Sequence, residues 1–241
     1  MKNFIFISPN FPTNYWMFCR ELKKNGLNVL GIGDQPYDEL SSDLKDSLNE
    51  YYKVSNLENS EEVYRAVAYF IFKHGRIDWL ESNNEYWLER DATLRMDFNI
   101  TSGFQAPDIP RIKFKSQMKK YYQQAGIPTA RYHMVDTPEN CLAFAHEVNY
   151  PVVAKPDNGV GASHTFKIES DSQMKRFFEL KWPDTPYIME EYVQGEVNSY
   201  DAIIDSKGEP MFETGNVTPN SIMDIVNNSD NSIYYILKNL P

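Results

Sequence analysis

The sequence has few cysteines and no excess of positive charge, and each shortage excludes a class of protein. Only two cysteines, Cys19 and Cys141, occur in 241 residues, and they lie far apart in no metal-ligand spacing. Two such thiols suit a reducing compartment rather than a disulfide scaffold. The net charge is -10, whereas a surface that binds nucleic acid needs an excess of lysine and arginine to neutralise phosphates. We therefore expect no nucleic-acid partner.

Long hydrophobic runs are also missing. The first apolar run, at positions 4–7, is too short for a signal peptide or a membrane span. We therefore predict a cytoplasmic protein without a membrane partner. The sequence shows no internal repeat and no low-complexity tract. Hydrophobic residues make up 41% of the chain and aromatic residues 14%, which is enough material for a true core that is rich in aromatic side chains.

Apolar strands alternate with amphipathic helices in the first part of the chain. The expected strands are Phe4–Ile7, Val29–Ile32 and Ile77–Leu80, and the expected helices are Tyr15–Lys24, Glu61–Lys73 and Trp87–Phe98. This alternation predicts an α/β domain with an open parallel sheet of the Rossmann-like type. The prolines at 107 and 110 lie in a stretch without periodicity, so we place this domain at residues 1–108.

The turn after the first strand lacks the glycines of a dinucleotide-binding site. Residues 8–13 read Ser-Pro-Asn-Phe-Pro-Thr, where the Rossmann fingerprint requires Gly-x-Gly-x-x-Gly so that a pyrophosphate can approach the backbone. Asp34 ends the second strand, where an acid would hold a ribose, but without the glycines this position carries little weight. A protein that binds NAD is therefore disfavoured. The turn shapes a small pocket or only packs, and helix N-termini at this edge of the sheet remain possible sites for a small anion.

Beyond residue 108 the strands follow one another with fewer helices between them, which predicts an α+β region with mainly antiparallel pairing. We expect a small lobe at 109–193 and the start of a larger lobe at 194–241. The expected helices are Phe114–Gln124, Pro138–Val148 and Asp171–Leu180; the expected strands are Arg131–Val135, Pro151–Lys155, His164–Ile168, Tyr187–Val193, Val197–Asp205 and Glu209–Glu213. The last two strands form a hairpin around Ser206-Lys207-Gly208.

Two strand ends in this region carry residues that suit a nucleotide. Lys155 ends an apolar strand, and a glycine-bearing loop follows it at 157–163. Such a loop can fold over phosphates while the lysine supplies a positive charge. The sequence Tyr-Ile-Met-Glu-Glu-Tyr-Val-Gln-Gly-Glu at 187–196 is an apolar strand that runs into carboxylates. Taken singly, each pattern is more typical of an ordinary hairpin with a solvated lysine and of a strand end with solvated acids.

A third pattern is the lysine-rich segment Lys-Phe-Lys-Ser-Gln-Met-Lys-Lys at 113–120. A run of lysines usually forms a solvated helix face, and Lys115 near the helix start is the exception. The order of the three patterns makes them informative together. A lysine opens a helix that ends in Gly-Ile-Pro-Thr at 126–129, Tyr-Pro-Val-Val-Ala-Lys with its loop follows at 150–155, and Ile-Met-Glu-Glu-Tyr-Val-x-Gly-Glu closes the series. This series closely resembles the ATP-grasp superfamily, and the first 108 residues look like its preceding domain.

The resemblance implies a role for each residue that matches the family pattern. Lys115 and Lys155 would contact the nucleotide phosphates; Gly159, Gly161, Ala162 and Ser163 would cover them; Glu190 would accept from the adenine amino group; Glu191 and Val193 would read adenine through the backbone; and Glu196 would bind the ribose. The family activates a carboxylate as an acylphosphate for attack by an amine or a similar nucleophile. Small carboxylates and amines are thus the expected substrates, and the particular acid and nucleophile stay open.

The family's magnesium-binding pattern, an acidic residue followed by a Glu-x-Asn motif, is not found after Glu196. Asp201, Asp205 and Glu213 lie in the right region but outside that pattern, so we assign no metal ligand and no catalytic residue. We expect ATP with Mg²⁺ as cofactors, with the Mg²⁺ ligands beyond the end of a chain that is shortened at its C-terminus and not catalytically competent alone. The alternative is a non-catalytic nucleotide-binding or regulatory module with the same fold.

Overall fold

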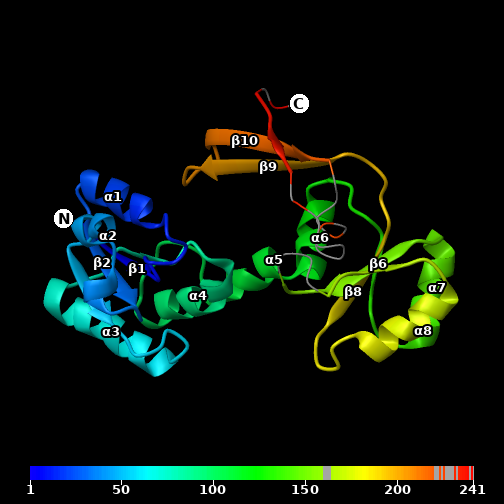
Figure 1. The fold of residues 1–241 in the computed structure, drawn as a ribbon, viewed down its shortest axis with the longest axis horizontal. Coiled ribbons are helices and arrows are strands. Elements are labelled where there is room, and N and C mark those ends of the chain that lie inside the picture. The colour runs from blue at the N-terminus through cyan, green and yellow to red at the C-terminus, as the bar shows by residue number, and fades with distance from the viewer. Residues whose placement is uncertain are drawn as a thin grey trace. The chain divides into compact units, whose positions relative to one another are not determined.

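The computed structural model describes residues 1–159, 164–219, 223, 225, 231, 233–238 and 240. The chain forms two compact units, Met1–Ile109 and Pro110–Pro241, shown as a ribbon in Figure 1. The helices are α1 (Trp16–Lys24), α2 (Ser42–Ser47), α3 (Ser60–His74), α4 (Leu88–Asp97), α5 (Ile109–Lys113), α6 (Lys115–Gln124), α7 (Pro138–Val148) and α8 (Asp171–Leu180), with short 3₁₀ turns at Tyr37–Glu39, Glu85–Trp87 and Ala106–Asp108. The strands are β1 (Asn3–Ile7), β2 (Asn28–Gly33), β3 (Glu50–Lys53), β4 (Trp79–Glu81), β5 (Tyr132–Met134), β6 (Val152–Pro156), β7 (Phe166–Ile168), β8 (Tyr187–Glu191), β9 (Val197–Ile204), β10 (Pro210–Thr218) and β11 (Tyr235–Ile236).

The first unit is built on a parallel sheet with the strand order β3-β2-β1-β4. All residues of β1 are buried. Since successive side chains of a strand point to opposite faces, both faces of β1 are covered. Ile5 and Ile7 pack in a core with Val67 and Phe70 of α3. The even-numbered positions of β1 pack with α1 and α2 in a second core. Figure 1 shows α1 and α3 on opposite sides of the sheet, as the predicted open parallel sheet of the Rossmann-like type requires.

The structure adds an edge strand and a short helix that the sequence analysis missed. Strand β3 pairs with β2 through the register Leu30↔Glu50. Its sequence, Glu-Tyr-Tyr-Lys, has neither a continuous apolar run nor a clear alternation, so only the neighbouring strand identifies it. Helix α2 has six residues and is capped by Ser41, whose side chain accepts a hydrogen bond from Leu44 N. A helix this short shows no readable period.

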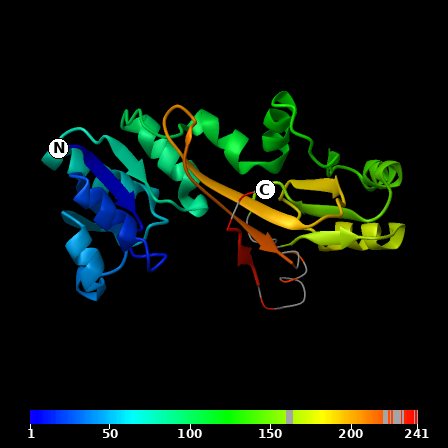
Figure 2. The same cartoon turned by 90° about the horizontal axis from the view of Figure 1, so that it is seen from above.

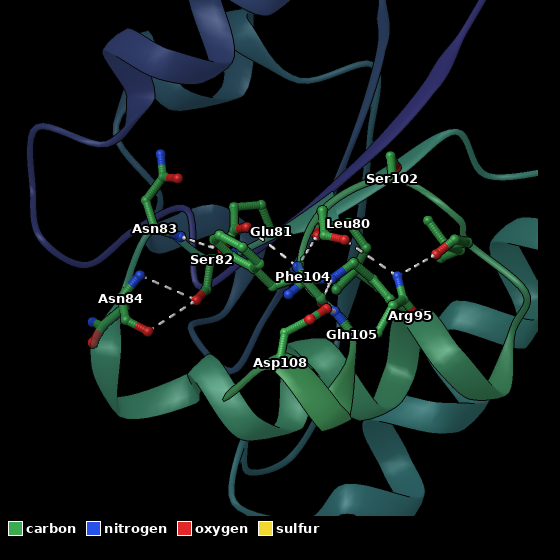
Figure 3. Close-up of polar contacts among 12 residues, drawn as sticks. Leu80, Glu81, Ser82, Asn83, Asn84, Arg95, Ser102, Phe104, Gln105 and Asp108 are labelled. Atoms are coloured by element: carbon green, nitrogen blue, oxygen red, sulfur yellow. Dashed lines mark hydrogen bonds and ion pairs between the residues drawn. The ribbon is translucent and has the colours of Figure 1, made fainter. Parts of the chain in front are cut away.

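A buried arginine ties α4 to the end of β4 (Figure 3). The Arg95 side chain is 1% exposed. Its Nε donates to Phe104 O at 2.8 Å, and its Nη1 donates to Leu80 O at 2.7 Å and lies 3.2 Å from Glu81 Oε2. Asp91, one turn earlier on α4, is fully buried, and neither carboxylate oxygen has a hydrogen-bond partner among the described residues. The first unit therefore contains one satisfied buried cation and one unsatisfied buried acid.

We predict that Asp91 makes the stability of the first unit fall as the pH rises. Burial raises the pKa of Asp91 from 3.8 to about 7. Between these two pH values the folded chain holds a proton that the unfolded chain has released, so unfolding becomes easier as the pH increases. A shift of about three pH units corresponds to at most about 4 kcal/mol in the free energy of unfolding.

The variant Asp91→Asn tests this prediction, since it is nearly isosteric with the protonated acid. Urea unfolding at pH 5 and pH 8, followed by tryptophan fluorescence, should show a smaller pH dependence for the variant than for the unaltered protein. Asp97→Asn is the matched control, because Asp97 is an exposed acid in the last turn of the same helix. An equal pH dependence in the Asp91→Asn variant and the unaltered protein would contradict the prediction.

The second unit contains an antiparallel sheet with the order β5-β8-β6-β7. Val152 and Ala154 of β6 and Met189 of β8 are buried on one face, in a core with Cys141 of α7 and Phe177 of α8. The two helices cover this face. Since side chains alternate along a strand, the positions between the core residues point to the other face. That other face carries the residues that resemble a nucleotide site.

A further antiparallel sheet of the second unit has the order β11-β10-β9. Strands β9 and β10 run side by side (Figure 2) and pair from Val197↔Thr218 to Ile204↔Pro210. The predicted hairpin is present, but β10 continues five residues beyond the predicted end at Glu213. The predicted fold class, α/β followed by α+β, is confirmed. In the described part of the chain, no helix is long and apolar enough to cross a membrane.

Candidate functional site

Strand pairing brings Lys155 and Glu190 to the same face of the small sheet. Strands β6 and β8 are antiparallel, with Val153 opposite Glu190 and Lys155 opposite Ile188. Lys155 Nζ reaches back along the sheet and lies 2.5 Å from Glu190 Oε2. The two residues that the sequence analysis assigned to a phosphate and to adenine are therefore in direct contact.

Lys119 of α6 completes a cluster of three charges with Lys155 and Glu190. Its Nζ lies 3.0 Å from Glu190 Oε1 and donates to Ala130 O at 2.8 Å. Only 8% of the Lys119 side chain and 12% of the Glu190 side chain are exposed. Burial raises the pKa of Glu190, but the two lysines together lower it by more than burial raises it. The pKa of Glu190 therefore lies below its ordinary value. The cluster is charged and carries a net positive charge at neutral pH.

The burial of Lys119 corrects the interpretation of the lysine run as a solvated helix face. Lys120 is exposed and contacts only Gln117 of its own helix among the hydrogen bonds described. Lys119 instead turns inward and lies 5.3 Å from the Tyr132 ring. The spacing of the lysines could have predicted this difference. Lys115 and Lys119 are four residues apart and share one helix face, whereas Lys120 lies on another face.

The start of α6 is joined to the loop after β6 by a second group of contacts. Asp157 accepts from Ser116 twice, from the backbone N at 2.8 Å and from Oγ at 2.7 Å. Lys115 Nζ donates to Gly159 O at 2.9 Å and to Asp157 O at 3.4 Å. Lys115 therefore lies at the beginning of the predicted phosphate loop. Gly161, Ala162 and Ser163 lie outside the described residues, so their predicted role stays a prediction.

Ser116 and Asp157 are residues that the sequence analysis missed. Both are buried, at 6% and 5% exposed, and they fix the position of Lys115 relative to the loop. Nothing local marks them, because Ser116 reads as an ordinary first-turn residue and Asp157 as an ordinary turn residue. The pair forms only when β6 and α6 are adjacent in space.

The remaining assigned residues are Glu191, which ends β8, and Val193 and Glu196, which follow that strand. The backbone N of Glu191 donates to Arg131 O at 3.0 Å, so any backbone contact of Glu191 with adenine must use its carbonyl. Its carboxylate accepts from Arg131 N at 2.8 Å and Arg131 Nε at 2.7 Å, and these contacts lower the pKa of Glu191. Val193 is 67% exposed, and Glu196 is also exposed. Both are accessible to a ligand, and among the described residues neither is joined to the Lys155–Glu190 pair by a hydrogen bond or ion pair.

The arrangement suits an anionic ligand that also carries a hydrogen-bond donor. Three lysine ammonium groups can contact phosphate oxygens or brace the groups that do. A carboxylate has about four acceptor positions, and the lysines occupy two directions on Glu190, so the group can still accept one more hydrogen bond. A nucleotide with an exocyclic amino group meets both requirements.

Comparison with known proteins finds the same superfamily that the sequence patterns resemble. Residues 127–219 match the family profile described as the ATP-grasp domain. The carbamoyl phosphate synthase large chain of Agathobacter rectalis is 26% identical over 118 residues, which make up 48% of this chain and 11% of that protein. The resemblance to the ATP-grasp superfamily that was predicted from the sequence is confirmed.

Solved structures agree in fold. The L-amino acid ligase from Bacillus licheniformis superposes with a TM-score of 0.64 at 18% identity, over 92% of this chain and 51% of that one. The biotin carboxylase domain of the Hydrogenobacter thermophilus 2-oxoglutarate carboxylase, solved with MgADP, ADP and bicarbonate, gives a TM-score of 0.70 at 16% identity, over 90% and 50%. This chain thus spans about half of each of these structures and about a tenth of the curated relative.

Proposed function

We propose that the second unit binds ATP and that the protein activates a carboxylate as an acylphosphate, for attack by an amine or a similar nucleophile. The observation that carries this proposal is the buried cluster of Lys119, Lys155 and Glu190, on the open face of the small sheet. It lies in the segment that matches the ATP-grasp domain, apart from Lys119, which precedes that segment. Small carboxylates and amines are the proposed substrate classes.

Each residue of the site has a proposed part in binding the nucleotide. Lys155 leaves Glu190 to contact a phosphate oxygen when the nucleotide enters, and Lys119 then remains as the counter-charge of Glu190. Glu190 accepts from the adenine amino group. Lys115, held at the loop by the Ser116–Asp157 pair, contacts the phosphates farther from the base. In phosphoryl transfer, the positive charges stabilise the negative charge that develops on the transferred group.

Magnesium belongs to this chemistry because it neutralises charge on the phosphates, but the described residues do not supply a fitting site. Asp201 accepts from Ser199 Oγ, and Glu213 accepts from Tyr200 OH. Within the described ranges, the one group of three convergent ligand side chains is His133, Asp136 and Cys141. A thiol and an imidazole do not suit Mg²⁺, which prefers oxygen ligands. We therefore assign no step to a residue-bound Mg²⁺.

Calorimetric titration of the purified 241-residue protein with ATP, ADP and NAD tests the nucleotide-binding part. We expect a single site for ATP and ADP and none for NAD. Tight binding of NAD without binding of ATP would refute the proposal. Phosphate release with panels of carboxylates and amines tests the ligase part. ATP binding without turnover on any panel would contradict the ligase part and favour the non-catalytic nucleotide-binding module.

A further inference from the structure

Three potential metal ligands of different chemical types converge at the start of α7. They are His133 on β5, Asp136 in the following loop and Cys141 in the first turns of α7, and their ligand atoms all lie within 4.8 Å of one another. His133 Nε2 lies 2.9 Å from Asp136 Oδ1. Nine residues of continuous chain thus supply a nitrogen, an oxygen and a sulfur donor to one point.

Local structure holds this cluster in place. Thr137 caps α7, with its side chain accepting from Asn140 N, and Pro138 occupies the first turn. Asp136 is fixed by Thr137 N at 2.7 Å and by Asn140 Nδ2 at 2.8 Å. Such outer contacts orient metal ligands in proteins and keep their side chains from rotating away. Helix α7 begins at Pro138, two residues after Asp136, and its first turn brings Cys141 close to His133 of β5.

The cluster lies on the other face of the sheet from the proposed nucleotide site. Tyr132 is paired with Glu190, whereas His133 is paired with Met189. Since successive side chains point to opposite faces, His133 shares the face of the buried Met189, which α7 and α8 cover. The imidazole ring also stacks on Phe144 of α7, with 5.8 Å between the ring centroids. The cluster is therefore separate from the residues proposed to bind ATP.

The set of donors selects a class of ion. Imidazole, carboxylate and thiolate together are typical ligands of Zn²⁺, which forms bonds of about 2.0–2.3 Å in tetrahedral geometry. Tetrahedral ligands at these lengths lie about 3.5 Å apart, so a contraction of roughly 1 Å at the widest pair, through side-chain rotation, completes the site. Calcium and magnesium are excluded by their preference for oxygen. Three protein ligands leave a fourth position for water or another small ligand.

We propose that His133, Asp136 and Cys141 form a binding site for a zinc-type divalent cation that joins β5 to the start of α7. The site is independent of the proposed nucleotide chemistry. Metal binding at this point would restrain the segment between β5 and α7 without contacting the Lys155–Glu190 pair.

Cobalt titration of the reduced, chelator-treated protein tests the proposal, because Co²⁺ reports its ligands in the absorption spectrum. We expect one equivalent of Co²⁺ to bind with a thiolate-to-cobalt charge-transfer band and visible bands of tetrahedral intensity, and Zn²⁺ to displace it. His133→Ala and Cys141→Ser should each weaken Co²⁺ binding at least about 10-fold. Loss of a residue that only orients a metal ligand already costs about that much affinity, and these variants remove a ligand itself. The variant Cys141→Ser should also lose the charge-transfer band.

Cys19→Ser and His146→Ala are the matched controls. Cys19 is the other buried cysteine and lies in the first unit. His146 lies on α7, as Cys141 does, and its ring pairs with Asp171 of α8 at 2.9 Å. Both variants should bind Co²⁺ as the unaltered protein does. Binding without a charge-transfer band, or unchanged binding in His133→Ala, would overturn the proposal. If Cys141→Ser does not fold, His133→Ala decides the matter, since the His133 side chain is 31% exposed. Calorimetric titration with ATP of the metal-free protein separates this test from that of the nucleotide site.

Discussion

Replacement of Lys155 by alanine should weaken ATP binding by about 10- to 100-fold. A hydrogen bond to a charged group contributes about 1.5–3 kcal/mol, and each 1.4 kcal/mol is a factor of ten in affinity. The second unit should keep its fold, because Lys119 still neutralises Glu190 and the Lys155 side chain is 28% exposed. Isothermal titration calorimetry with ATP measures the loss, and circular dichroism checks the fold.

Helix α6 offers a control and a graded comparison for this experiment. Lys120→Ala removes an exposed lysine from the same helix as Lys119 and should leave ATP affinity unchanged. Lys119→Met should weaken ATP binding, because Glu190 would have no lysine partner once Lys155 turns to the phosphate. It should also lower the stability of the second unit, because the buried Glu190 loses one of its two lysine partners. Equal affinities for Lys155→Ala and the unaltered protein would show that the nucleotide, if bound, does not use this cluster.

Replacement of Arg95 by leucine should lower the free energy of unfolding of the first unit by about 3–5 kcal/mol. Removal of one partner from a buried charge network leaves the others uncompensated. Three acceptors would lose their donor, namely Leu80 O, Phe104 O and Glu81 Oε2 (Figure 3). The buried Asp91 would also lose a nearby positive charge that lowers its pKa.

Tryptophan fluorescence during urea unfolding can follow this change, because three of the four tryptophans, Trp16, Trp79 and Trp87, lie in the first unit. Arg65→Leu is the control. Arg65 pairs with Glu61 one turn away on α3, and both side chains are more than 70% exposed, so its loss should cost less than about 1 kcal/mol. Similar losses for the two arginines would mean that the Arg95 contacts carry no special weight.

The sequence by itself determined the alternation of strands and helices and the order of the nucleotide-type patterns. Apolar runs such as Phe4–Ile7 show a buried parallel strand because both of their faces need covering. The positions of Lys115, Lys155 and Glu190 within their elements could also be predicted from the sequence. Each lies near the end of a helix or strand that its own periodicity identifies. The edge strand β3 was not readable, because its pairing with β2 rather than its own sequence makes it a strand.

Only the tertiary structure decided which charged side chains meet. Lys119 looked like one member of a solvated run until the packing of α6 placed it beside Glu190. Asp91 and Arg95 are charged residues within the predicted helix Trp87–Phe98, and nothing in their local sequence shows that both are buried. Contacts of this kind join residues far apart in the chain or depend on which helix face is covered, and these are set by packing rather than by local pattern. The sequence therefore determined the elements and their order, while packing determined the charged clusters that we propose to act in binding.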